Sequence, residues 1–195
     1  MQLTQPFKGV YFRGEHGENS TGSMFHSRLG SVSFGTEEVS KVYALEPNIR
    51  HEYPVKPRVY KVELTLSSML DLGTDPFIDV SLLRHFLDEE QVGAVLENPD
   101  VCSAVMNTDN FATLTESMDG FIYELSDFVD LGGSVDDLYF EAYHLFDNQM
   151  FCDWFKQVGI DGVRHGGSGE SALTMEVKCF DPSVSCRILD VVHLR

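Results

Sequence analysis

Apolar and polar residues alternate with a period of two near the start of the chain. Lys8 to Phe12 and Val59 to Leu66 both follow this pattern, which predicts strands with one solvated face. Ser31 to Phe34 forms a shorter strand candidate. Thr36 then stands where it can cap a helix over residues 37–45, whose first turn carries two acids. The first part of the chain is therefore expected to be rich in strands.

Between about residues 77 and 157 the spacing of apolar residues becomes helical. Two repeats carry this pattern: Val80, Leu83, Phe86 and Leu87, and Phe121, Leu125, Phe128 and Val129. Ser134 with Asp137 resembles a capping box, and it predicts a helix running through Phe140, Tyr143, Leu145, Phe151 and Phe155. We expect this block to supply packing and cover.

Strand signals return after residue 158. Gly159 to Arg164 is typical of a turn into a short strand, and His165 to Ser171 of a Gly/Ser loop. Met175 to Phe180 predicts a strand ended by Asp181 and Pro182, and Arg187 to Leu194 predicts a last strand. The fold class expected is α+β: one domain over residues 1–195, with a strand-rich core (7–72 and 158–195) and a helical insertion (about 77–157).

Charge narrows the classes of partner. The net charge is −17, from 31 acidic and 14 basic residues, so nucleic acid and anionic membrane surfaces are disfavoured. A basic protein surface would be attracted, although charge can serve solubility alone. No apolar run approaches the roughly 20 residues of a membrane span, and the first residues do not resemble a secretory signal.

The cysteines point to a reducing compartment and away from metal binding. Cys102, Cys152, Cys179 and Cys186 form no CxxC pair, and no His or Cys pair has the spacing of zinc ligands. We therefore expect reduced thiols, no metal site and a cytoplasmic location, which would be a host cytoplasm for a phage-borne or delivered protein.

Four separated segments carry the candidate chemistry, and each has a purely structural alternative. Arg13 ends a strand beside Gly14, where a planar guanidinium could bind phosphate or ribose oxygens, or could simply close the strand. Gly30 to Thr36 offers hydroxyls on a strand that feeds a helix. Val59 to Leu72 is a strand and its exit. Glu176 lies in an apolar strand after Gly159 to Arg164, so its carboxylate needs either partners or a function.

The order of these segments resembles the ADP-ribosyltransferase superfamily, especially its small bacterial and phage-type members. A Tyr-Arg-Gly-like strand end matches Tyr11 to Gly14, and a Phe-Ser-Thr element followed by Tyr-Ala is similar to Ser33 to Thr36 with Tyr43 and Ala44. The strand over Val59 to Leu72, the Gly-Tyr-Asp-Gly-Val-like turn at Gly159 to Val163, and Glu176 to Pro182 complete the likeness. It covers roughly residues 7–72 and 158–190.

The resemblance implies a split β-sheet fold and the use of NAD as a substrate. It implies that Glu176 is the catalytic acid, that Arg13 with Gly14 binds the ribose and phosphate side of NAD, and that Ser33 or Ser31 holds the nicotinamide amide or orients the glutamate. Phe34 and Tyr43 would be apolar walls for nicotinamide. Thr36 belongs to the same NAD-binding element. The acceptor of ADP-ribose would be a macromolecule, in the first place a protein, and the net negative charge of this chain favours one with a basic surface.

The sequence departs from the family pattern at two places. In the element from Ser33 to Thr36, the serine usual in the family is either replaced by Gly35 or shifted to Ser33. The second acid that arginine-directed transferases often carry two residues before the catalytic Glu is Thr174. Glu170 is a rival catalytic acid, and His16 could contact a phosphate or be a solvated loop residue. NAD hydrolysis and non-catalytic binding through an acidic surface stay open as alternative functions.

Overall fold

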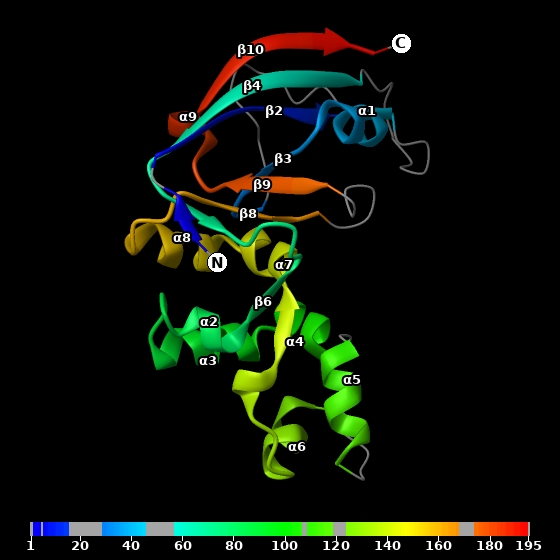
Figure 1. The fold of residues 1–195 in the computed structure, drawn as a ribbon, viewed down its shortest axis with the longest axis vertical. Helices are drawn as coiled ribbons and strands as arrows, with labels where there is room; N and C mark the ends of the chain where they lie inside the picture. Colours follow the sequence, from blue (N-terminus) through cyan, green and yellow to red (C-terminus); the bar gives the residue numbers. More distant parts are fainter. Residues whose placement is uncertain are drawn as a thin grey trace.

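The computed structural model describes residues 2–4, 6–15, 29–45, 57–106, 109–118, 124–167 and 174–194 (Figure 1). The chain is a mixed α and β protein with open sheets, as expected at this level. The predictions made for the loop after Glu15 with His16, for Phe121 and for Glu170 lie outside the described residues.

Five strands form a first sheet, called sheet A here. Its order is β1 (Gln2–Thr4), β5 (Met69–Asp71), β8 (Gly162–Gly166), β9 (Met175–Cys179) and β3 (Val32–Phe34). β5 and β8 run parallel, and the other neighbours are antiparallel. The strands predicted around Ser31 to Phe34 and Met175 to Phe180 are confirmed. The loop predicted from His165 is wrong at its start, because pairing with β9 extends β8 to Gly166.

Three longer strands form a second sheet, called sheet B here. Its order is β10 (Cys186–His193), β4 (Arg58–Leu66) and β2 (Phe7–Glu15), all antiparallel, and the short helix α9 (Pro182–Ser185) leads into β10. A bridge joins the sheets: Phe12 N donates to Gly35 O at 3.0 Å, and Gly35 N donates to Phe12 O at 2.9 Å. Figure 1 shows sheet B at the top with sheet A beneath it.

A compact apolar cluster fills the space between the two sheets. It includes Phe34, Val62, Leu64 and Val177, each no more than 1% exposed. The predicted helix is confirmed as α1 (Glu37–Leu45), and the predicted cap is confirmed because Val39 N donates to Thr36 Oγ1 at 3.3 Å. The sheets and α1 therefore follow the local patterns in the sequence.

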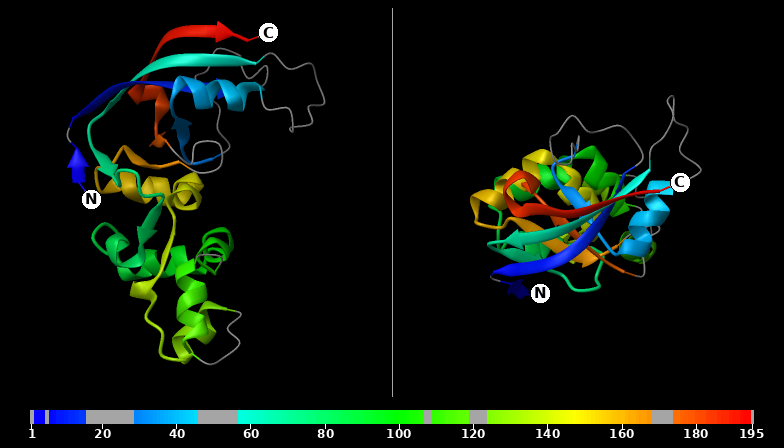
Figure 2. Two further views of the ribbon diagram at one scale, coloured as in Figure 1. Left: turned by 45° about the vertical axis from the view of Figure 1, so that its right-hand side comes forward. Right: turned by 90° about the horizontal axis from the view of Figure 1, so that it is seen from above.

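Residues 77–157 form the insertion, which lies below sheet A in Figures 1 and 2. Its elements, in chain order, are β6 (Phe77–Asp79), α2 (Val80–Leu83), α3 (Glu89–Glu97), α4 (Pro99–Met106), α5 (Asp109–Glu116), α6 (Leu125–Asp130), the 3-10 turn η1 (Val135–Asp137), β7 (Tyr139–Glu141), α7 (Ala142–Asp147) and α8 (Gln149–Gln157). Its apolar core is continuous with one face of sheet A, where it includes Leu70 and Val163. The insertion is thus anchored on the sheet face opposite sheet B.

The long helix predicted from Ser134 through Phe155 is wrong. Ser134 does accept a hydrogen bond from Asp136 N at 3.3 Å, but the turn it caps is short. Phe140 then lies in β7, paired with Ile78 of β6. Asn148 ends α7 and caps α8, accepting from Met150 N at 3.0 Å. Long-range strand pairing and an internal cap outweigh the helical spacing of the apolar residues.

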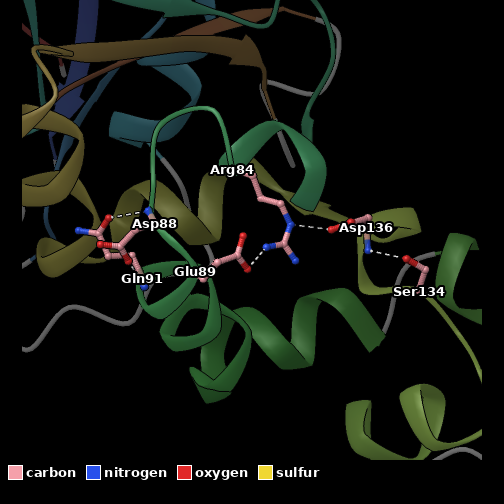
Figure 3. Close-up of polar contacts among 6 residues, drawn as sticks. All are labelled: Arg84, Asp88, Glu89, Gln91, Ser134 and Asp136. Carbon is pink, nitrogen blue, oxygen red and sulfur yellow. Dashed lines mark hydrogen bonds and ion pairs between the residues drawn. The ribbon is translucent and has the colours of Figure 1, made fainter.

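A small polar network fastens the outer part of the insertion (Figure 3). Arg84, just after α2, donates to Asp136 Oδ1 at 2.8 Å and also pairs with Glu89. Asp88 and Gln91 form a reciprocal capping box at the start of α3, with bonds of 2.8 and 3.0 Å. The network joins α2, α3 and η1 at the surface, away from sheet A.

Candidate functional site

Arg13 extends from β2 toward the strand that carries Ser33. Its Nη1 donates to the backbone oxygen of Ser33 at 3.1 Å, and its Nε lies 3.4 Å from Glu15 Oε1. The other carboxylate oxygen of Glu15 accepts from Arg58 Nη2 at 3.1 Å. The side chain of Arg13 is 19% exposed, so the guanidinium is fixed in direction yet can still be reached. Arg13 is therefore tied directly to the β3 segment.

Glu176 lies on the face of sheet A that the insertion covers. Side chains alternate along a strand, so Glu176 and Lys178 share this face, whereas Val177 and Cys179 join the core between the sheets. In the register, His165 stands opposite Glu176, and Ser33 stands opposite Lys178. Directly opposed side chains point to the same face. Four polar side chains from three strands are thus gathered on one side.

Gly35 lies between the strands that carry Arg13 and Glu176. Continuing the register of β3 and β9 places Gly35 beside Glu176, and Gly35 also bridges to Phe12, the neighbour of Arg13. Among the described residues, no heavy atom lies within 4 Å of the position that a Cβ at residue 35 would occupy. The register directs that position to the Glu176 face. Within the part of the chain that the structure describes, the space beside the carboxylate is therefore open.

Lys178 is a buried cation with partners from two other elements. Its side chain is 0% exposed, and its Nζ donates to Asp147 Oδ1 at 2.5 Å and to Ser33 Oγ at 3.2 Å. The same Nζ lies 4.3 Å from the centre of the Tyr143 ring. A buried ammonium is tolerated only when it is paired in this way. Asp147 and Tyr143 both come from α7, so the insertion contributes directly to the site.

The pKa of Tyr143 is raised by burial and by the charges around its phenol. Burial, the charge and hydrogen bond of Asp147, and the nearby Glu176 and Tyr43 together raise the pKa of Tyr143 to about 12. The phenol is therefore neutral at neutral pH, as a hydrogen-bond donor beside carboxylates should be. Its hydroxyl lies close enough to Glu176 and to Tyr43 of α1 for their charges to act on it.

His165 and Ser31 present buried polar atoms on this face. His165 is 0% exposed, and burial lowers its pKa, so the ring is neutral. Its Nδ1 lies 2.6 Å from Gly166 O; a carbonyl only accepts, so Nδ1 carries the proton and Nε2 is an acceptor. Neither His165 Nε2 nor Ser31 Oγ has a hydrogen-bond partner among the described residues. Ser31 is 3% exposed.

The other predicted site residues divide into structural and exposed positions. Gly14 has a structural reason, since an added Cβ would stand 2.0 Å from the Ser40 backbone oxygen of α1. We expected a ligand to lie close to the backbone at Gly14, but α1 occupies that place instead. Phe34, expected as a wall of the site, is instead 1% exposed in the core between the sheets. Thr36 uses its hydroxyl to cap α1. Tyr43 is 46% exposed, and its role as a wall stays a prediction.

Sequence reasoning missed four residues of this site: Tyr143, Asp147, His165 and Lys178. Lys178 could have been found, because a lysine two positions after Glu176 in an apolar strand must share its face. Tyr143 and Asp147 gave no such signal, since their helix reaches the sheet only through tertiary packing. His165 was assigned to a loop, and only the pairing with β9 places it in β8.

Metal sites and membrane spans were sought over the described part of the chain. Within it, no group of three or more His, Cys, Asp or Glu side chains is arranged to hold a metal ion. Within the same ranges, no helix combines the length and the apolar character that crossing a bilayer requires.

Comparisons with protein-family models, with curated proteins and with solved structures gave no significant match for this chain. The likeness to ADP-ribosyltransferases stays a prediction from residues 7–72 and 158–190.

Proposed function

We propose that this protein cleaves the bond between nicotinamide and ribose in NAD and transfers ADP-ribose to a macromolecular acceptor, in the first place a protein. The supporting observation is the space that the described residues leave open over Gly35, which the register places beside Glu176 and which bridges to Phe12, the neighbour of Arg13. The two charged residues stand 163 positions apart in the sequence. The proposed reaction needs both groups to contact one bound NAD.

Glu176 supplies the chemistry. Breaking the C1′–N bond leaves positive charge on the ribose, as in glycoside hydrolysis. The electron pair of that bond leaves with nicotinamide, which departs neutral. A carboxylate beside the ribose 2′-hydroxyl stabilises the developing cation in a site where water is largely excluded. The acceptor's nucleophilic atom then bonds to C1′, and its proton passes to solvent.

Arg13 and the exposed aromatic residues hold the substrate. The guanidinium of Arg13 is oriented by Ser33 O and Glu15, and its planar donors suit phosphate and ribose oxygens. Tyr43 offers an exposed aromatic face and Tyr143 a partly buried one, and Tyr43 and Glu176 both lie near enough to raise the pKa of Tyr143. Ser31 has a buried hydroxyl that a ligand's amide could engage.

The charge of the insertion favours an acceptor with a basic surface. Residues 77–157 contain 17 acidic and two basic residues, a net charge of −15 out of −17 for the whole chain. This insertion also provides Asp147 and Tyr143 to the site. A basic protein attracted to the insertion would be brought to the part of the molecule that also supplies Asp147 and Tyr143.

The decisive experiment incubates the protein with NAD labelled in the ADP-ribose part, with and without cell lysate, and follows nicotinamide release and labelled protein. Glu176→Gln should lower the rate of nicotinamide release on the order of 10²–10³-fold. Glu97→Gln, the same change on the exposed face of α3, is the matched control and should behave as the wild type. Full activity in a folded Glu176→Gln protein would remove Glu176 from the mechanism.

A second variant tests the space itself. Gly35→Val adds bulk where the described residues leave room, so the midpoint of urea unfolding should hardly change. NAD binding, measured by calorimetry, should weaken at least tenfold because the added methyl groups occupy the substrate's place. Unchanged NAD affinity in this variant would show that NAD does not bind over Gly35.

The same assays separate the competing functions. Fast nicotinamide release without an acceptor would identify a NAD hydrolase. Absence of NAD binding, together with salt-sensitive binding to basic proteins, would identify a non-catalytic acidic binding protein.

A further inference from the structure

We infer that Lys178 is a positioning residue: it fixes the hydroxyl of Ser33 as a hydrogen-bond donor toward Glu176 and so couples the insertion to the reaction site. This inference rests on the proposed function for its effect on catalysis, but its hydrogen-bond geometry stands independently. A continuous line of polar contacts carries it. Asp147 meets Lys178 at 2.5 Å, Lys178 meets Ser33 Oγ at 3.2 Å, and Ser33 O accepts from Arg13 at 3.1 Å.

The donor character of Ser33 follows from the chemistry of its partner. An ammonium group has only donors, so Ser33 Oγ must accept from Lys178 Nζ. The single hydroxyl hydrogen of Ser33 then points away from Lys178 and is available to an acceptor. Glu176 is the diagonal neighbour of Ser33 across the β3–β9 pair and lies on the same face. A serine without the lysine could turn either way.

The burial of Lys178 explains why the hydroxyl hydrogen of Ser33 keeps one direction. Its side chain is 0% exposed, and solvent cannot compete for its protons. Asp147 balances its charge, and the face of Tyr143 lies against it at 4.3 Å. Asp147 and Tyr143 both belong to α7. Movement of the insertion would therefore change the position of Lys178, and with it the contacts of Ser33 with Lys178 and Arg13.

The first test is a double-mutant cycle in steady-state NAD cleavage, using Lys178→Met, Ser33→Ala and the double variant. If Lys178 acts through Ser33, each single variant should lower kcat about 10²-fold with little change in KM, and the double variant should be no slower. Lys156→Met is the matched control, because Lys156 also pairs with an aspartate at 2.5 Å but on the exposed surface of α8. Its kcat should equal that of the wild type.

Multiplied losses in the double variant, or a Lys178→Met protein whose kcat is unchanged, would overturn the positioning role.

A second measurement does not depend on NAD. The same four proteins are unfolded in urea, and the coupling between positions 178 and 33 is taken from the cycle of unfolding free energies. Coupling well above that of a Lys156→Met and Ser33→Ala cycle is expected. If the wild type fails to cleave NAD, the proposed function fails, and this cycle alone decides the inference: coupling supports the fixed hydroxyl, and additivity overturns it.

Discussion

The strand-rich part and the insertion handle charge in opposite ways. Outside residues 77–157 the chain has 14 acidic and 12 basic residues, so charges are nearly balanced, and the ion pair of Arg58 with Glu15 is buried. Inside those residues the balance is 17 to two, and an ion pair such as Arg84 with Glu89 lies at the surface. Buried paired charges hold directions, whereas solvated like charges set a long-range field.

The two parts also have separate apolar cores. One core lies between sheets A and B, and the other joins the insertion to the opposite face of sheet A. Sheet A is thus shared, and the polar site lies on the face it presents to α7. The comparison indicates that the sheets position Ser33, Glu176 and Lys178, while the insertion supplies burial, the side chains of Tyr143 and Asp147 and most of the negative charge.

The largest expected change in stability comes from creating a cavity in the apolar core of the insertion. Phe140→Ala removes a ring that is 0% exposed and should lower the free energy of unfolding by about 4 kcal/mol. Hydrogen exchange should show the loss first in α4 and α7, while β2 and β4 keep their protection. Phe34→Ala, at the equally buried position in the other core, should reverse this order. The same exchange pattern in both variants would mean that the cores are not separate.

A smaller effect is expected at the junction of the two parts. Asp147→Asn leaves Lys178 buried without its counter-charge and should cost about 3 kcal/mol in urea unfolding. It also removes the carboxylate that helps to raise the pKa of Tyr143, so that pKa should fall from about 12 toward 10. The pKa of Tyr143 is measured from the absorbance change on ionisation of tyrosine. Tyr143→Phe in the wild type and in Asp147→Asn identifies the part of that change that belongs to Tyr143.

The sign of the pH dependence follows from the same shift. The folded pKa of Tyr143 is raised, so its contribution to stability is present below pH 10 and is lost as pH rises toward 12. In Asp147→Asn this alkaline loss should be smaller. An unchanged phenol titration would show that Asp147 does not act on Tyr143.

The smallest effect is expected at the outer network of the insertion. Arg84→Met breaks contacts with Asp136 and Glu89 at a partly exposed position (Figure 3), which should cost about 1 kcal/mol or less. The cost should shrink further at high salt, because exposed pairs are screened. NAD cleavage should be unaffected, since this network lies away from sheet A. A large loss of activity would mean that the outer insertion contributes to the site.

The sequence alone determined the elements whose patterns are local. Alternation predicted β2 and β4, the cap at Thr36 predicted α1, and the turn at Gly159, which has a φ of +84°, predicted the entry to β8. Tertiary structure decided the rest. Phe140 became a strand residue through Ile78, and Phe34 became core. Lys178 met Asp147 only when the insertion folded onto sheet A, and His165 met Glu176 only through the pairing of β8 with β9. Local spacing encodes which face a residue occupies, but which distant face it meets depends on packing between segments far apart in the chain.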